Sequence, residues 1–252
     1  MPSPQVWEQW LALMGRGLLG TLQLSLISSL LTILLGAVLA VLAVSQSIVV
    51  RGLARAWIEF FRSIPVLALM ILLYFGFGPL AASLGLNAFT LAVVALTLSM
   101  ASYQAEVFRG AIQGVPSTQW SAARSIGMSH GQSLRLIIIP QVLAPLIPAV
   151  VNIVIGVIKL SSLASLITVS ELSLAGVQSV SISFYPMHVY VLLGLFYAAL
   201  ILPLIYFSRW LERWAQRRFG LVSAAVDRRL LDSYADAKEE AELAEVDRKL
   251  TT

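Results

Sequence analysis

The chain has 252 residues, of which 58% are hydrophobic and 12% are charged. Soluble domains carry roughly 25% charged residues, so this composition excludes an ordinary soluble protein and predicts an integral membrane protein. Cysteine is absent and only two histidines are present, which excludes disulfides, thiol catalysis and cysteine metal sites. We therefore expect no metal site and no catalytic residue in this chain.

Residues 1–16 predict a short amphipathic helix in the membrane interface. They contain Trp7 and Trp10, and tryptophan side chains favour the level of the lipid headgroups. The segment lacks the basic start of a signal peptide, and the apolar run that follows is too long for one. We expect this interfacial helix to precede a membrane domain that covers residues 17–219.

Five apolar stretches are long enough to cross the hydrocarbon core, which requires a helix of about 20 residues. They are residues 17–44, 57–77, 88–108, 141–162 and 187–208. The sequence therefore predicts an all-α integral membrane protein with five transmembrane helices.

Basic residues occur in alternate loops, which predicts the orientation of the spans. The loops after the first and third spans and the end of the fifth contain arginines, namely Arg51, Arg55, Arg109, Arg124, Arg135, Arg209, Arg213, Arg217 and Arg218. The loops at 78–87 and 163–186 contain no basic residue. Because cytoplasmic loops are enriched in Lys and Arg, we expect the N-terminus outside and the C-terminus in the cytoplasm.

The fourth stretch, 141–162, is unusual for a helix that faces lipid. Pro145 and Pro148 lie near its start, and proline removes a backbone donor and kinks a helix. Its polar residues are expected to face the bundle interior or a water-filled path. The polar segment that follows predicts a re-entrant or interfacial helix outside the membrane. Within it, Glu171 either contacts a docking protein or is solvated.

The loop at 112–140 predicts two short helices joined by a tight bend. Ser117 is the expected N-cap of the first helix, and Gly127 is its expected left-handed C-cap. Ser129 and Gln132 have the spacing of a capping box at the start of the second helix. Two roles are open for this compact unit: it lies against its own bundle, or it transmits force from a cytoplasmic partner.

This loop resembles the EAA loop of ABC importer permeases. The matching residues are Ala122, Ala123, Gly127, Ile137 and Pro140. Further segments resemble the polar amino acid branch of that family: "TLQLSLISSLLTILLGAVLA" at 21–40, "EFFRSIPVL" at 59–67, "YQAEVFRGAIQGVPSTQ" at 103–119, "IIIPQVLAPLIPAVVN" at 137–152 and "KLSSLASLITVSEL" at 159–172. The resemblance covers roughly residues 17–215.

The resemblance implies the transmembrane subunit of an importer that moves amino acids, or amino-acid-like solutes such as opines, across the bacterial inner membrane. The implied partners are two ABC ATPase subunits, a second permease subunit that is identical or homologous, a periplasmic solute-binding protein and membrane lipid, but no nucleic acid. This chain has no G-x-x-x-x-G-K-[ST] loop. We therefore expect a non-catalytic subunit without a cofactor, with ATP and Mg on the ATPase. The alternative is a secondary solute transporter that needs no ATPase.

The resemblance also implies which residues couple the chain to the ATPase. They are Gln119, Trp120, Ser121, Ala122, Ala123, Arg124 and Gly127. Ser121 stands where the loop usually has a glutamate. Docking is therefore expected to depend on the small residues and on neighbours such as Trp120 and Arg124.

Two groups of polar residues are candidates for the substrate path. They are Ser102, Tyr103, Gln104 and Glu106 in the third stretch, and Lys159, Leu160, Ser161 and Ser162 at the end of the fourth. Relatives usually read Lys-Asp-Thr-Ser-Leu in the second group, so Leu160 replaces a carboxylate. Since a carboxylate favours cationic ligands through a charge-assisted hydrogen bond, we expect a neutral, acidic or opine-like substrate.

Structural roles remain open for the same residues. Glu106 forms an ion pair with Arg109, or it lines the path. The polar residues at 102–104 form hydrogen bonds between helices, or they contact substrate. Lys159 extends to the outer headgroups, or it lines the path.

Residues 220–252 form a separate segment by composition. They contain 5 basic and 8 acidic residues and are rich in alanine, glutamate and leucine, which favour helix. Two interpretations are open: a solvated, partly disordered tail, or a cytoplasmic helix that contacts the ATPase or its regulator.

Overall fold

The computed structural model describes residues 2–219, and all regular structure in that range is helical. The elements are α1 (Pro4–Ala43), α2 (Ile48–Ser63), α3 (Val66–Ile71), η1 (Leu72–Gly76), α4 (Gly78–Ser83), α5 (Ala88–Gln113), α6 (Ser117–Ser125), α7 (His130–Ser133), η2 (Leu134–Ile138), α8 (Ile139–Ser161), η3 (Ser162–Ile167), α9 (Leu172–Ser183) and α10 (Pro186–Phe219). η1 and η2 are π-helical, and η3 is a 3₁₀-helix. The predicted tail, 220–252, lies outside the described residues.

Four helical segments are long and apolar enough to cross a membrane: α1, α5, Leu146–Ile167 and Pro186–Ala215. The bent pair of α2 with α3 and η1, which meet at an angle of 94°, is either a fifth, broken span or a re-entrant loop. The stretch predicted at 57–77 is therefore bent near its middle. Pro65 explains the bend, because proline has no N–H and pushes the preceding residue into an extended conformation. Ile64 accordingly has φ −93° and ψ 121°.

The first helix includes the segment that was predicted as a separate interfacial helix. α1 runs without a break from Pro4 to Ala43, so no helix boundary exists near residue 16. Trp10 is only 1% exposed, and its Nε1 donates a hydrogen bond to Ser183 Oγ at 3.2 Å. The indole ring of Trp10 therefore packs α1 against the end of α9.

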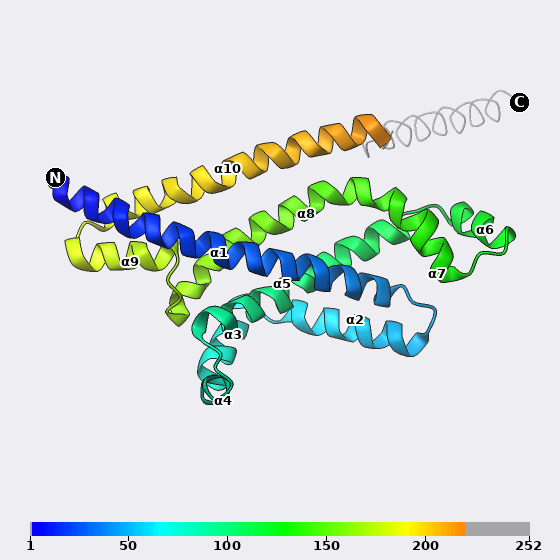
Figure 1. The fold of residues 1–252 in the computed structure, drawn as a ribbon, viewed down its shortest axis with the longest axis horizontal. Coiled ribbons are helices and arrows are strands. Elements are labelled where there is room, and N and C mark those ends of the chain that lie inside the picture. Colours follow the sequence, from blue (N-terminus) through cyan, green and yellow to red (C-terminus); the bar gives the residue numbers. More distant parts are fainter. Residues whose placement is uncertain (1, 220–252) are drawn as a thin grey trace, which may run out of the picture.

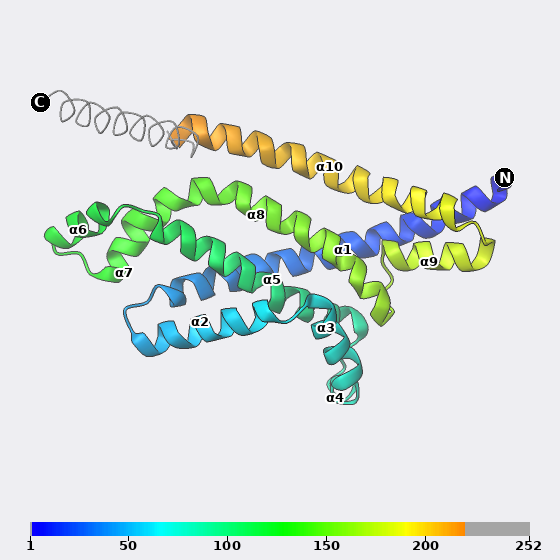
Figure 2. The same ribbon diagram turned by 180° about the vertical axis from the view of Figure 1, so that it is seen from behind.

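Two glycines of α1 allow the segment around α9 to approach closely. A Cβ atom on Gly17 would lie 2.8 Å from the Cβ of Ala175, and one on Gly20 would lie 2.0 Å from the carbonyl oxygen of Ser170. Small residues permit this kind of close helix contact in membranes. α9 therefore lies against the first half of α1, as both views show (Figures 1 and 2).

α5 is the most buried of the four candidate spans. It packs along α1, where a Cβ atom on Gly36 would lie 2.8 Å from the Cβ of Gln104. The bundle is elongated, with the N-terminus and α9 at one end and α6 and α7 at the other (Figure 1). We call the end with α6 and α7 the loop end.

α8 contains both prolines that were predicted to interrupt the fourth span. It is nevertheless one continuous helix from Ile139 to Ser161, and it curves visibly along its course (Figure 1). The carbonyl oxygen of Pro148 accepts a hydrogen bond from Ser208 Oγ of α10 at 3.4 Å. The prolines therefore lie in a bent but unbroken helix that contacts its neighbour.

The short helix expected after the fourth span is present as α9. Its 12 residues extend over about 18 Å, which is less than the hydrocarbon core of about 30 Å. η3 precedes it, and Thr168 between them has a left-handed φ of 63°. This segment therefore turns back against the bundle and does not cross the membrane as a further span.

Candidate coupling loop and substrate path

The loop between α5 and α8 folds as two short helices around a glycine bend. Gly127 has φ +80°, so its predicted left-handed conformation is confirmed. Its N–H bonds to the carbonyl of Arg124 at 2.9 Å, and the next N–H, of Met128, bonds to the carbonyl of Ala123 at 3.1 Å. These bonds close the end of α6 in the manner of a left-handed C-cap. A residue with a Cβ is strained in this conformation.

Of the predicted N-terminal caps of the two helices, one is confirmed and the other is wrong. Ser129 and Gln132 form the expected capping box, with bonds of 2.8 and 3.3 Å between side chains and backbone. Ser117 is not an N-cap, because Pro116 occupies that position and Ser117 is the first helical residue. Pro116 has the extended ψ of 137° that an N-cap adopts.

The loop is attached to the bundle by an aromatic pair and by apolar contacts. The rings of Trp120 and His130 are stacked, with centroids 4.9 Å apart and planes at 14°. Trp120 also packs against the buried cluster that includes Ile112 and Ile138. Ala123 is 1% exposed. The loop is thus fixed to the ends of both α5 and α8.

The seven predicted coupling residues therefore divide into two groups. The exposed ones are Gln119, Ser121, Ala122, Arg124 and Gly127. Trp120 is half-buried and Ala123 is buried. The first group faces outward, where a partner can contact it, and the second group fixes α6 to the bundle.

Two of the predicted path residues on α5 are packing residues. Ser102 is buried and its Oγ donates to the carbonyl of Leu98 at 3.0 Å. Gln104 is fully buried against Gly36 of α1. Both side chains are therefore covered by neighbouring helices, but Ser102 bonds within α5 and the Gln104 amide has no hydrogen-bond partner among the described residues. The expected hydrogen bonds between helices are not formed by these two residues.

Tyr103 is the exposed member of this group. It is 41% exposed, and its hydroxyl donates to the carbonyl of Arg62 at 3.4 Å. The guanidinium of Arg62 lies 5.5 Å from the centre of the Tyr103 ring, within the range of a cation–π contact. This pair joins α5 to the end of α2, next to the bend at Pro65.

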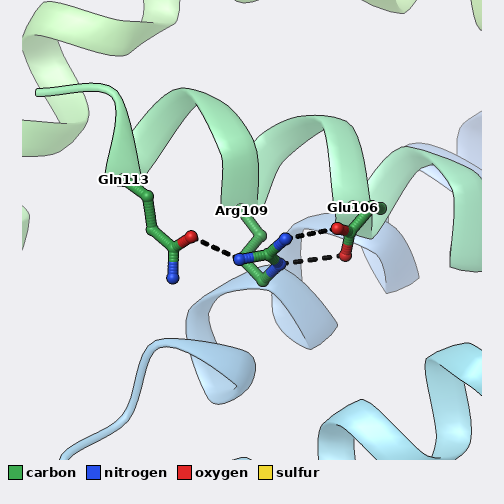
Figure 3. Close-up of polar contacts among 3 residues, drawn as sticks. All are labelled: Glu106, Arg109 and Gln113. Carbon is green, nitrogen blue, oxygen red and sulfur yellow. Dashed lines mark hydrogen bonds and ion pairs between the residues drawn. The ribbon is translucent and has the colours of Figure 1, made fainter.

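Glu106 forms the ion pair with Arg109 that the sequence allowed. Figure 3 shows the guanidinium of Arg109 between the carboxylate of Glu106 and the side-chain oxygen of Gln113, and Arg109 Nε lies 2.9 Å from Glu106 Oε2. The pair lines a cavity of about 310 Å³ between α5 and α2, together with Arg55 and Arg62. Glu106 therefore both forms an ion pair with Arg109 and lines a cavity.

The second predicted group lies at the end of α8. Lys159 is exposed, and Ser162 Oγ donates to its carbonyl at 2.7 Å. Ser161 is buried and bonds to the carbonyl of Ile158 at 2.8 Å. Leu160 is half-buried and packs against the apolar cluster that includes Leu96.

The two predicted groups occupy different levels of the bundle. Leu160 packs near Leu96 in the first half of α5, whereas Glu106 lies beside the cavity near its end. The helix rises about 1.5 Å per residue, so these two levels are separated by about 15 Å along α5. A solute path that includes both groups therefore runs along α5.

Glu171 has a place that the sequence did not indicate. Its side chain is fully buried, and Oε1 accepts the N–H of Leu174 at 2.8 Å as the N-cap of α9. Oε2 accepts hydrogen bonds from Tyr197 of α10 at 2.9 Å and Thr21 of α1 at 3.4 Å. One carboxyl group therefore joins α1, α9 and α10, and neither the solvated nor the docking role describes it.

The surroundings of Glu171 also change its acidity. Burial raises the pKa of its carboxyl group, and the hydrogen bonds that it accepts from the backbone, Tyr197 and Thr21 oppose that effect. A buried carboxylate is costly without hydrogen-bond partners, and the polar segment around Glu171 did not indicate that it is buried. The partners themselves lie 150 and 26 residues away and cannot be identified from local sequence.

Comparison with known proteins relates this chain to membrane subunits of transport systems. The chain matches the family described as "Binding-protein-dependent transport system inner membrane component" over residues 32–220. It is 34% identical over 198 residues to the probable amino-acid ABC transporter permease protein YckA of Bacillus subtilis, covering 79% of this chain and 87% of that protein. It is 33% identical over 201 residues to the nopaline transport system permease protein NocM of Agrobacterium fabrum, covering 75% and 83%.

Solved structures agree with these relatives. A crystal structure of an amino acid ABC transporter with histidines superposes with a TM-score of 0.75 at 29% identity, covering 84% of this chain and 99% of that chain. The MetNI methionine ABC transporter in an inward-facing conformation gives a TM-score of 0.70 at 21% identity, covering 85% and 99%, and so shares the fold. The chain belongs to the family of binding-protein-dependent transport system inner membrane components.

Proposed function

We propose that this chain is the membrane-spanning subunit of an ABC importer for amino acids or for amino-acid-like solutes such as opines. The observation that carries the proposal is the two-helix loop, which exposes small and polar residues on α6 and is fixed to the bundle by Trp120 and Ala123. The relatives named as amino-acid and nopaline permeases support this class of solute.

The loop transmits motion because it is short, capped and attached at both ends. α5 ends at Gln113 and α8 begins at Ile139, so a displacement of α6 acts on two spans at once. A partner ATPase that binds the exposed face of α6 would move these spans when its own two halves close. ATP and Mg belong to that ATPase, and this chain contributes no catalytic residue.

The proposed assembly has two ATPase subunits, two permease subunits and a periplasmic solute-binding protein. The second permease subunit is a copy of this chain or a homologue. The loop end faces the cytoplasm, and the end with α9 and the N-terminus faces the periplasm, as the alternating arginines predict. The binding protein delivers its solute at the periplasmic end.

We assign the substrate path to the exposed members of the two predicted groups. Tyr103 and Lys159 are exposed, Glu106 lines a cavity and Leu160 is half-buried. Ser102, Gln104 and Ser161 are buried, and we assign them to the packing that holds the path residues in place. Ser162 bonds to the backbone of Lys159 and orients the same turn. The leucine at 160 favours neutral, acidic or opine-like solutes over cationic ones.

Reconstitution tests this function against that of a secondary transporter. The full chain is purified with its ATPase and second permease subunit and placed in proteoliposomes with the matching binding protein. We expect uptake of a labelled amino acid or opine only when ATP and the binding protein are both present. Uptake by the chain without an ATPase, driven by an ion gradient, would identify a secondary transporter instead.

A further inference from the structure

A second cavity, of about 410 Å³, lies at the loop end, where the connection from α1 to α2 meets the end of α5 and the coupling loop. Its polar lining consists of Arg51, Arg55, Gln113, Ser117 and the stacked rings of Trp120 and His130. Its lining residues include no carboxylate. We call it the arginine cavity.

The two arginines give this cavity a positive charge, and no carboxylate is among its lining residues. Arg51 Nη1 donates to the carbonyl of Ser45 at 2.8 Å, which orients the side chain and leaves further N–H donors. The guanidinium of Arg55 forms no ion pair within residues 2–219, although it interacts electrostatically with Glu106 across the adjoining cavity. Guanidinium groups bind phosphate and carboxylate groups in a two-pronged geometry. The arginine cavity therefore suits an anionic group.

The acidic residues nearby lie in the adjoining cavity and do not line the arginine cavity. Glu59 and Glu106 line the adjoining cavity, and the carboxylate of Glu106 is held by Arg109. Arg55 lines both cavities. Of the two arginines, Arg51 therefore lines only the arginine cavity, which contains no carboxylate.

The position of α2 indicates where such an anionic group comes from. α2 begins at Ile48, directly after the four-residue connection that follows the apolar helix α1. Ile48, Val49 and Leu53 are 76%, 69% and 68% exposed. Apolar side chains next to arginines on one helix are typical of a helix at the membrane surface. The first two to three turns of α2 thus offer contacts to acyl chains and to a charged headgroup.

We propose that the arginine cavity binds the phosphate of an anionic phospholipid headgroup, with the acyl chains along the exposed apolar face of α2. Basic pockets at the cytoplasmic surface of membrane proteins bind anionic lipid headgroups in this way. The bound headgroup contacts α2 through Arg51 and Arg55, and it contacts the coupling loop through Ser117 and Trp120. Lipid occupancy therefore ties the position of the coupling loop to that of α2.

Native mass spectrometry of the purified full-length chain tests this site. The protein is incubated in detergent with phosphatidylglycerol or with phosphatidylcholine, and bound lipids are counted. We expect the unaltered chain to retain phosphatidylglycerol in preference to phosphatidylcholine. The double variant R51Q/R55Q should bind phosphatidylglycerol roughly thirtyfold more weakly, since each basic residue near an anionic lipid contributes about fivefold.

Two control variants separate the site from general charge effects and from misfolding. R135Q/R213Q removes two exposed arginines that do not line the cavity, and it should retain phosphatidylglycerol as the unaltered chain does. R51K/R55K keeps the charge and should keep most of the preference. Because the comparison of the two lipids also uses the unaltered chain, it does not depend on the folding of any variant.

Three results would overturn the proposal. The first is equal retention of the two lipids by the unaltered chain, or unchanged binding by R51Q/R55Q. The second is full displacement of phosphatidylglycerol by millimolar inorganic phosphate, which would make a free anion the occupant. The third is that the R51Q/R55Q variant keeps phosphatidylglycerol but no longer co-purifies with its partner ATPase. That result would place an acidic group of the ATPase in the cavity.

Discussion

At the scale of single residues, Leu160 is the proposed path residue that departs from the pattern of relatives. It is half-buried against the apolar cluster that includes Leu96, and we propose that the accessible edge of its side chain faces the solute. Leu160→Asp should raise uptake of arginine or lysine relative to glutamine by about tenfold or more, because a hydrogen bond to a charged group contributes about 1.5–3 kcal/mol. Competition between labelled solutes in proteoliposomes measures this ratio.

Leu160→Asn is the matched control, because it has the size and polarity of the aspartate without the charge. It should lower overall activity as much as Leu160→Asp and leave the ratio of cationic to neutral uptake unchanged. An equal ratio in both variants would mean that residue 160 does not face the solute.

Gly127 is the residue on which the shape of the coupling loop depends. Gly127→Val should strain the bend, because a Cβ is unfavourable at φ +80° by about 1–2 kcal/mol and a branched side chain by more. We expect weaker co-purification of the ATPase and a clear loss of ATP-driven uptake, with solute binding by the binding protein unaffected.

Gly131→Ala is the control for that substitution. Gly131 is exposed in the short helix α7, and a Cβ there meets no atom within 4 Å. This variant should couple normally. If Gly127→Val also retained full ATPase attachment and uptake, the bend would have no part in coupling.

At the scale of elements, Glu171 holds α9 to α1 and α10. Glu171→Ala leaves the N–H of Leu174 and the hydroxyl of Tyr197 without their acceptor. The free energy of unfolding should fall by about 1–3 kcal/mol, measured as a lower thermal midpoint of the purified chain. Glu171→Gln retains one acceptor oxygen and should lose less. An unchanged midpoint in Glu171→Ala would show that this carboxyl group does not stabilise α9.

The same group gives the stability a dependence on pH. Burial raises the pKa of Glu171 in the folded chain, so the folded state favours the protonated form more than the unfolded chain does. This contribution is fully present below the unfolded pKa of about 4.3 and is lost as pH rises through the raised folded-state pKa. The midpoint of the unaltered chain should therefore fall relative to Glu171→Gln as pH increases, and parallel curves would contradict this assignment.

At the scale of the whole molecule, the bundle is a multi-pass inner-membrane protein whose two ends differ in charge. The chain has no cysteine, so single cysteines report orientation without background. A cysteine at Gln119 in α6 should resist a membrane-impermeant maleimide in intact cells and react after lysis. A cysteine at Ser83, in the opposite loop, should react in intact cells. The reverse pattern would invert the proposed topology.

Local sequence was sufficient where one segment determines its own structure. The apolar stretches, the glycine at 127 and the capping box at Ser129 depend on the length and local bonding of neighbouring residues, and the structure has them as expected. Pro65 is open to the same reasoning, because the restriction on the residue before proline favours a break in the stretch 57–77, and the two parts meet at 94°. The family resemblance added the role of the loop, which spacing alone left open.

The sequence by itself determined that this is a helical membrane protein with long apolar spans and a capped polar loop, because hydrophobic length and backbone conformation are local properties. Only the tertiary structure decided which polar side chains are covered. Trp10 is buried against α9, Gln104 against α1, and Glu171 between three helices. Burial depends on what packs against a residue, and those contacts join segments that are 26 to 173 residues apart.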